Sequence, residues 1–447
     1  MTARFALALA GVPLAFGAGA LASHRVLPAL GVSARALDQP LLVVTSWGGS
    51  GFVAWGLLAA TIAAASIPYA IAAGEAERIE RSRFAILGVI VASVLASAAA
   101  AAFRFVFSSD VYAYAAYGAL LAAGGDPYRP HVMSQTLLAT PAFADAVRFE
   151  WPSLPTCVYG PAFLYLASAL VAGTHADLAA VLRGMRALAV VAFAASLALI
   201  ARSAPDRRPL IAALVGLNPV AIWSVAEGHN DALVLMFAAA GALVARARPM
   251  FGGAVIALAS VLKAIAVPVA LGFAALARRR DACAGALIGL ILAAGAQAAA
   301  IGAAGGLQVM VATDFVGTRD AALSEGLRGV MALAVLMTTL VLWGGGARLR
   351  GLAAGALVVW LLLPHHYAWY GLWLLPLAAV TSRTSEGKAL LAATFCGLLR
   401  YLPDAAGFAA AVPWTGLLAA SIPTAILLVP PMSAAWRSNP GEKAIIR

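Results

Sequence analysis

The sequence FSSDVYAYAAYGALLAAGGDPYRPH, residues 107–131, is the first long polar interruption after three apolar segments. Ser108 and Ser109 are favourable N-cap residues, and the Gly-Gly-Asp-Pro run at 124–127 is typical of a helix end. The residues between predict a short helix over 111–123, with Asp110 in its first turn, where the positive end of the helix dipole favours a carboxylate. We expect the chemistry of the protein on this stretch.

One face of this predicted helix combines an acid with two phenols. Asp110, Tyr114 and Tyr117 follow the i, i+4, i+7 spacing, which places them side by side at the membrane surface. A sheltered, ionised aspartate has the properties of a general base. A surface helix that Asp110 merely caps would show the same spacing, so the pattern leaves both roles open.

Composition places the chain in a membrane. The 447 residues are 63% hydrophobic and 11% charged, with a mean hydropathy of +0.92, whereas soluble domains are about one quarter charged. Apolar runs near the roughly 20 residues needed to cross a bilayer recur from end to end. We expect an all-α, polytopic transmembrane bundle of about 12 to 14 spans. It would form a single membrane domain over 1–447, with 107–155 as the first large extracytoplasmic loop carrying short juxtamembrane helices.

The net charge of +11 has a topological explanation. Basic residues are scattered through short loops instead of forming a long patch interleaved with aromatics, so we expect no nucleic-acid partner. With the amino terminus inside, most basic loops fall inside and Asp110 falls outside, as the positive-inside rule requires. The loops at 202–208 and 246–248 would fall outside under the same count, so we expect half-spans or re-entrant segments between 157 and 277.

Polar residues also interrupt the apolar runs. Lys263 is mid-span, too far from either end of its run to snorkel easily, and an anionic group is its natural partner. His229 and Asn230 belong to the cluster Glu227–Asp231 (EGHND) and are candidate substrate ligands. A helix cap by Asn230 or Asp231 explains the cluster equally well, and the HExxH pattern of zinc helices is not present in it.

Aromatic and histidine side chains gather at PHHYAWYGLW, residues 364–373. Such a run is typical of an aromatic belt at a membrane interface, but rings with polar edges also bind sugars, and histidines supply donors for a phosphate or hydroxyl. Both interpretations stay open. Arg104, near the outer end of the third span, would either snorkel or meet a lipid phosphate. The candidates within the aromatic run are His365, His366, Tyr367 and Trp369.

The order of these features resembles the glycosyltransferase-C superfold, and within it the polyprenol-phosphomannose-dependent α-1,6-mannosyltransferases. The resemblance extends from the third predicted helix to the eleventh or twelfth, and order and spacing carry it because no motif is diagnostic singly. The matching pieces are SSDVYAYAAYG (108–118), GGDPY (124–128), YGPAFLYLASAL (159–170), NPVAIWSVAEGHNDALVLM (218–236), the buried Lys263 and HHYAWYGLWLLPL (365–377).

The resemblance implies that Asp110 is the catalytic carboxylate. It also implies a polyprenyl-phosphate sugar, expected to be mannose, that enters sideways from the bilayer, and an extracytoplasmic glycan or glycolipid acceptor. Two positions depart from the family pattern: Asp126 stands where Asn is frequent, and His365–Tyr367 replaces a Pro-Trp-Tyr run. The resemblance therefore does not fix the sugar or the acceptor.

The chemistry of such a donor agrees with this interpretation. A polyprenyl phosphate is a competent leaving group, whereas the acceptor hydroxyl needs a base during attack, so Asp110 would promote an inverting transfer. Lys263, Arg104 or the two histidines would stabilise the phosphate charge. No cofactor is required, although a divalent ion on the outer carboxylates stays open. The predicted substrate-binding residues are Arg104, Tyr114, Tyr117, Asp126, Tyr128, His229, Asn230, Lys263, His365, His366, Tyr367 and Trp369.

Two alternatives belong to other classes. A secondary transporter or lipid flippase would use Lys263 and the Glu227–Asp231 cluster as a midplane site, but the sequence shows no paired halves, and its longest polar loop is predicted outside the membrane. Another lipid-linked glycan enzyme, such as an oligosaccharide ligase or an aminoarabinose-type transferase, would differ in its donor. The compact loops indicate a multi-pass protein of a bacterial inner membrane with an extracytoplasmic active site.

Overall fold

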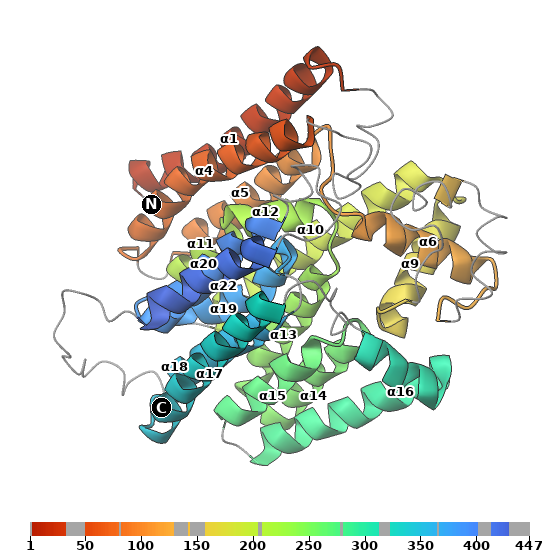
Figure 1. The fold of residues 1–447 in the computed structure, drawn as a ribbon, viewed down its shortest axis with the longest axis vertical. Coiled ribbons are helices and arrows are strands. Elements are labelled where there is room, and N and C mark those ends of the chain that lie inside the picture. The colour runs from red at the N-terminus through yellow and green to blue at the C-terminus, as the bar shows by residue number, and fades with distance from the viewer. Residues whose placement is uncertain are drawn as a thin grey trace.

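A computed structural model describes residues 2–32, 50–79, 82–128, 142–143, 157–203, 208–277, 280–312, 322–363, 366–400 and 413–428. Within these ranges the chain is helical and contains no strand, which confirms the predicted all-α fold (Figure 1). The elements are α1 (Ala3–Ala29), α4 (Ser50–Ala76), α5 (Arg83–Ala101), α6 (Asp110–Ala122), α9 (Pro161–Gly173), α10 (Leu178–Ser203), α11 (Arg208–Gly216), α12 (Pro219–Ala226), α13 (Asp231–Ala245), α14 (Pro249–Leu258), η1 (Ala259–Val261), α15 (Ala266–Ala277), α16 (Arg280–Ala312), α17 (Ala322–Gly344), α18 (Arg348–Leu362), η2 (Ala368–Tyr370), α19 (Gly371–Val380), α20 (Ser385–Cys396), η3 (Gly397–Arg400) and α22 (Pro413–Leu428).

The helices divide into long and short apolar elements. Among the described residues, six helices are long and apolar enough to cross a membrane, namely α1, α4, α5, α10 and parts of α16 and α17. α11 and α12 pass the same test together but bend by 55° at the break between them. Shorter apolar helices such as α9 and α13 complete the bundle. The polytopic helical bundle is confirmed, and the total of 12 to 14 spans stays a prediction.

Small residues let these helices approach closely. α1 and α4 lie side by side along one edge of the molecule, and α14 and α16 along another (Figure 1). A Cβ added to Gly285 of α16 would collide with the Met250 carbonyl of α14, and one added to Gly253 would collide with the Ala282 carbonyl. Close backbone approach is the usual way for membrane helices to associate, because lipid is as apolar as their side chains.

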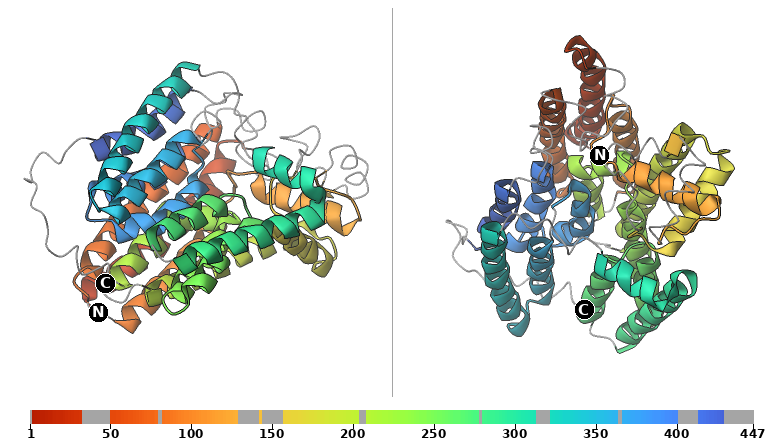
Figure 2. Two further views of the ribbon diagram at one scale, coloured as in Figure 1. Left: turned by 90° about the horizontal axis from the view of Figure 1, so that it is seen from below. Right: turned by 45° about the vertical axis from the view of Figure 1, so that its right-hand side comes forward.

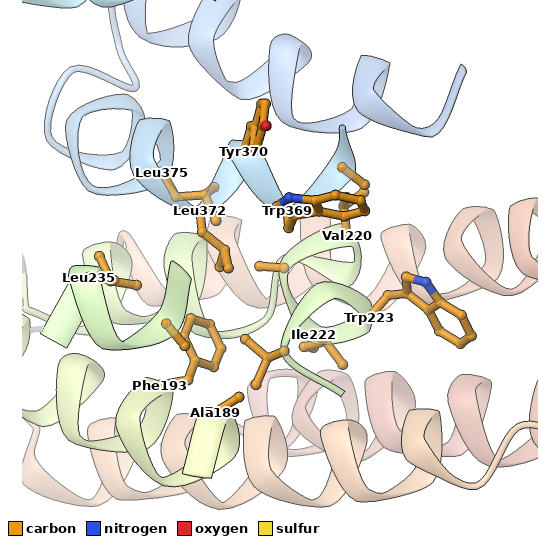
Figure 3. Packing of buried hydrophobic residues seen from close by; sticks show 14 of the residues in the cluster. Ala189, Phe193, Val220, Ile222, Trp223, Leu235, Trp369, Tyr370, Leu372 and Leu375 are labelled. Atoms are coloured by element: carbon orange, nitrogen blue, oxygen red, sulfur yellow. The ribbon is translucent and has the colours of Figure 1, made fainter. Parts of the chain in front are cut away.

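An aromatic cluster fixes the segment between α5 and α6. The indole of Trp223 in α12 packs against the rings of Phe103, Phe105 and Phe107. The ring-centroid distances are 5.0, 6.0 and 5.9 Å respectively. Figure 3 shows Trp223 at the edge of the neighbouring core, which contains Phe193 of α10 and Ile222 of α12. Because the chain at 103–107 is held by buried rings, the start of α6 has a defined position.

Contacts between the segments that join the helices define two ends of the bundle. At one end, Asp110 at the start of α6 lies beside His229, which follows α12. At the other end, Arg383 donates to Glu77, which follows α4, with an Nε to Oε1 distance of 2.9 Å. α5 connects these ends, since it begins at Arg83 and finishes shortly before Asp110. The two views of Figure 2 show the long helices running between the ends.

This arrangement places basic residues of the two loops that disagreed with a strict alternation of spans. Arg246 follows α13 and donates to the carbonyl of Arg202 in α10, with an Nη1 to O distance of 2.8 Å. α13 begins beside His229, so the pair lies a helix length away from Asp110. The expected break is present at the α11–α12 bend, and α9 packs against α6 with only 13 residues. These basic residues therefore lie at the end opposite Asp110, not beside it.

Candidate active site

Asp110 is the first residue of α6, one residue before the predicted helix start. Ser109 occupies the N-cap position, but it is the hydroxyl of Ser108 that accepts the Asp110 N–H, at 3.1 Å. The Asp110 side chain is 22% exposed. At the first turn it also faces the positive end of the helix dipole, which favours the carboxylate form. The carboxylate is therefore placed at a helix start and is partly accessible from outside the core.

His229 connects Asp110 to a second acid, Glu227. The Nδ1 of His229 lies 3.5 Å from Asp110 Oδ2, and its Nε2 lies 3.5 Å from Glu227 Oε2. The other oxygen of Glu227 accepts the backbone N–H of Phe107 at 2.6 Å. Burial lowers the pKa of His229, but the contacts and charges of Asp110 and Glu227 outweigh burial, so the pKa is raised above its ordinary 6.5. The acids thus favour the imidazolium.

An aromatic column supports this histidine. The ring of His229 stacks on Trp369 at 3.9 Å, and Trp369 stacks on Tyr367 at 4.4 Å. Trp369 is 3% exposed, and Figure 3 shows it above Val220 of α12. Together, Asp110, His229 and Glu227 form the Asp110 group. The predicted sugar-binding aromatics Tyr367 and Trp369 therefore lie beside this group, and Trp369 fixes the plane of the imidazole.

A second cluster, formed by Lys263, Asp231 and Trp373, lies on the other side of the connection between α12 and α13. Lys263 donates to both oxygens of Asp231 at 3.0 Å, and the indole N–H of Trp373 donates to Asp231 Oδ1 at 2.6 Å. The ammonium of Lys263 also lies 5.8 and 5.5 Å from the ring centres of Tyr159 and Tyr370. The anionic partner expected for Lys263 is thus a residue of the chain, so its charge is compensated internally.

Local backbone geometry brings both clusters together. Asn218 caps α12 by accepting the N–H groups of Val220 and Ala221 at 3.0 Å, and its amide donates to Thr394 of α20. Gly228 has a φ of +91°, a conformation that glycine adopts without the Cβ penalty. This turn places His229 on one side of the connection and Asp231 on the other. Asn230 stands at the N-cap position of α13.

The predicted tyrosines divide into two groups. The Tyr114 hydroxyl lies 3.5 Å from Asp110 Oδ2 and 3.4 Å from Asn230 Oδ1, so Tyr114 and Asn230 lie beside the Asp110 group. Tyr117 is buried one turn further along α6, with its ring 6.3 Å from that of Tyr159. Tyr128 instead ties the chain together, because its hydroxyl donates to the Tyr159 carbonyl at 2.8 Å.

Other predicted site residues have structural contacts. The Asp126 carboxylate accepts the N–H of Tyr128 at 2.9 Å in a local turn. His366 is buried, with its Nε2 at 3.0 Å from the Trp360 carbonyl of α18. The backbone N–H of Arg104 donates to Ser23 of α1 at 3.0 Å. His365 lies outside the described residues. So do residues 129–141 and 144–156 of the large loop.

Arg186 of α10 escaped the sequence analysis. Its Cγ and the Cγ2 of Val111 flank Gly228, at 3.3 and 3.2 Å from where a Cβ would lie, so the arginine borders the Asp110 group. Its Nε is buried and has no hydrogen-bond partner among the described residues. The signal available in the sequence was a basic residue within an otherwise apolar run, the same argument that identified Lys263.

Within the described ranges, no three side chains of His, Cys, Asp and Glu converge as a metal site would require. The site is instead an acid–histidine–acid group, stacked on aromatic rings, at one end of a helical membrane bundle. The fold belongs to the class of polytopic helical membrane proteins.

Residues 3–280, more than half of the chain, match the family model described as alpha-(1->6)-mannopyranosyltransferase, N-terminal domain. The chain belongs to this family, and it is accordingly a membrane glycosyltransferase that acts with mannose. The matched range contains Asp110, Arg186, the Glu227–Asp231 connection and Lys263. Tyr367 and Trp369 of the aromatic column lie after it. Comparisons with curated proteins and with solved structures found no match.

Proposed function

We propose that the protein transfers mannose from a polyprenyl-phosphate donor to a glycan or glycolipid acceptor outside the membrane, with Asp110 as the general base. One observation carries the proposal. Three acids gather at this end of the bundle, and Asp110 keeps 22% exposure, whereas Glu227 keeps 4% and Asp231 none. Of these acids, Asp110 is the one that an acceptor hydroxyl reaches.

The reaction follows from this position. Asp110 takes the proton of the acceptor hydroxyl, and the oxygen attacks the anomeric carbon from the face opposite the phosphate. The bond between that carbon and the phosphate oxygen breaks, the phosphate leaves with the electron pair, and the configuration inverts. The leaving phosphate needs no proton, because it is already a stable anion.

The phosphate requires a cation close to Asp110. Lys263 is compensated by Asp231 in the described structure, whereas the Nε of Arg186 has no acceptor there. An arginine at the Gly228 turn suits a phosphate oxygen because its planar fork of donors matches that geometry. We assign the donor phosphate to the Arg186 side of the Gly228 turn.

Sidedness is part of the same proposal. The end opposite Asp110 carries Arg202, Arg246 and Arg383, and basic residues of this kind favour the cytoplasmic face. This supports an extracytoplasmic site in a bacterial inner membrane, where a lipid-linked donor arrives from within the bilayer. The transporter alternative is weakened because the family model describes a transferase and the Lys263 charge is paired internally.

Transfer by purified protein in lipid tests the proposal. Polyprenyl-phosphate mannose and a nucleotide-linked mannose are compared as donors, and Asp110→Asn is compared with wild type. We expect transfer from the lipid donor alone, and its loss in the variant. Asp177→Asn is the matched control, because Asp177 is an exposed carboxylate that caps the start of α10 through the Ala179 N–H at 2.9 Å, a bond that Asn also accepts. Full activity of Asp110→Asn, or binding of the donor without transfer by wild type, contradicts the proposal.

A further inference from the structure

His229 makes its polar contacts with two carboxylates of different accessibility. One ring nitrogen faces Asp110 and the other faces Glu227, both at 3.5 Å, while the histidine itself is 1% exposed. Among the described residues, neither ring nitrogen nor Glu227 Oε2 has a hydrogen-bond partner of good geometry. The three groups are therefore one another's polar neighbours, and His229 and Glu227 are almost fully buried whereas Asp110 is partly exposed.

Among the described residues, the side-chain contacts of Asp110 are directed to its Oδ2. Both the His229 Nδ1 and the Tyr114 hydroxyl lie 3.5 Å from Oδ2. This leaves Oδ1 for the acceptor hydroxyl. A base held through one oxygen presents the other in a fixed direction, which is the arrangement that general-base catalysis needs.

The surroundings favour a charged histidine. The titratable groups that face it are Asp110 from α6 and Glu227 from its own connection. The Tyr114 phenol of α6 lies against Asp110, and Arg186 of α10 borders the turn at Gly228. Trp369 and Tyr367 of the aromatic column contribute uncharged rings. Two acids in direct contact outweigh one more distant arginine, so the imidazolium is the compensated form.

We infer that His229 is a positioning residue for the transfer reaction: as an imidazolium held by Glu227 and Trp369, it orients Asp110 and compensates its charge. The inference rests on the proposed function, because it assumes that Asp110 is the base. During transfer Asp110 Oδ1 takes the acceptor proton and then releases it to water through its exposed side, while His229 keeps its own protons. Glu227 balances the imidazolium when Asp110 is neutral.

Rates of mannose transfer as a function of pH test this role. In wild type we expect kcat to fall on the alkaline side, where His229 loses its proton. His229→Gln should lower kcat by about 100-fold, should abolish this alkaline limb, and should leave KM for the lipid donor within about twofold. Glu227→Gln should shift the limb to lower pH, because one of the two stabilising acids is gone. His175→Asn is the control, since His175 is an exposed histidine at a φ of +52°, which Asn tolerates.

The outcomes separate this inference from the proposed function. If Asp110→Asn is inactive while His229→Gln keeps the wild-type kcat and alkaline limb, the inference is wrong and the base assignment stands. If wild type does not use the lipid donor at all, the proposed function fails first. Should His229→Gln fail to fold, as judged by size-exclusion chromatography, Glu227→Gln decides: an unshifted alkaline limb overturns the inference.

Discussion

Arg186 is the residue through which the donor phosphate is best tested. Its side chain borders Gly228, and its Nε is buried without a hydrogen-bond partner among the described residues. Replacement by Met keeps most of the apolar stem and removes the charge. We expect Arg186→Met to lower kcat/KM for the lipid donor by about 100-fold, roughly the effect of losing one charge-stabilising donor.

Arg183 provides the matched control for this variant. It lies one turn earlier on α10 and is exposed, so Arg183→Met should change kcat/KM little. Arg186→Lys should recover part of the activity, because an ammonium supplies the charge without the planar fork. Wild-type kcat/KM in Arg186→Met would show that the phosphate binds elsewhere.

His229 also makes stability depend on pH. Its folded pKa is raised above 6.5, so its contribution to stability is fully present below the unfolded pKa and is lost as pH rises through the folded value. We expect the Tm of the wild type in detergent to fall across that alkaline range. The difference in Tm between wild type and His229→Gln should shrink over the same range. A difference that is constant with pH would mean that His229 is neutral in the folded protein.

At the scale of single residues, the sequence predicted part of the site. Helical spacing is enough to place Tyr114 beside Asp110, and a dense polar cluster between apolar runs is enough to nominate His229. The partner of Lys263 could not be predicted, because Asp231 is 32 residues away in the chain and the connection between them has no periodic pattern. Ser109 occupies the N-cap position as predicted, but the sequence could not show that the Ser108 hydroxyl makes the hydrogen bond, since either serine satisfies the same preference.

The start of α9 is locked to η1, and this junction holds the aromatic ring of Tyr159 near Lys263. The Gly160 N–H donates to the Leu262 carbonyl at 3.0 Å, and a Cβ on Gly160 would collide with the Val261 carbonyl. Because the obstacle is backbone, we expect Gly160→Ala to lower stability by about 2–3 kcal/mol and to reduce activity. Thermal unfolding in detergent and the transfer assay measure these effects.

Gly173→Ala is the control within the same helix. Nothing lies within 4 Å of a Cβ added there, so this variant should keep wild-type Tm and activity. If Gly160→Ala behaves like Gly173→Ala, the α9–η1 junction is looser than the structure indicates.

The caps of α12 and α20 separate a role in catalysis from a role in stability. Asn218 is fully buried and holds the α11–α12 bend that delivers Glu227 and His229. Thr384 caps α20 near the opposite end, accepting the Gly387 N–H at 3.2 Å. Each substitution by Ala should cost about 1 kcal/mol or more in stability, but only Asn218→Ala should also lower kcat. Equal loss of kcat in both variants would contradict the positioning role of the bend.

Elements with strong periodicity or clear caps were predicted with their bounds, whereas broken spans were predicted only as a region of the chain. The helix expected at 111–123 is found at Asp110–Ala122, because its cap and its Gly-Gly end are local signals. Between 157 and 277 the basic loops predicted half-spans or re-entrant segments without placing them, and the structure has the chain bending at Asn218 and again near η1. Those bends depend on contacts with α20 and α9 that lie far away in the sequence.

At the scale of the whole molecule, the two ends of the bundle make opposite predictions for accessibility from outside the cell. Ala123 is exposed just after α6, the helix that begins at Asp110, and Ala247 is exposed between Arg246 and Arg248 at the other end of the bundle. Cysteine placed at each position is labelled with a membrane-impermeant maleimide in intact cells, in a background with Cys283→Ser, because Cys283 is the exposed native thiol among the described residues. We expect Ala123→Cys to react in intact cells and Ala247→Cys to react only after permeabilisation.

This experiment also decides between the simple alternation of spans and the folded arrangement. Alternation puts 246–248 on the same side as Asp110, whereas the hydrogen bond from Arg246 to Arg202 and the course of α13 put it on the opposite side. Reaction of both cysteines in intact cells would restore the alternating topology and remove the support that basic residues give to an extracytoplasmic site. Reaction of Ala247→Cys alone would invert the molecule, and a lipid-linked donor would then have to be used at the cytoplasmic face.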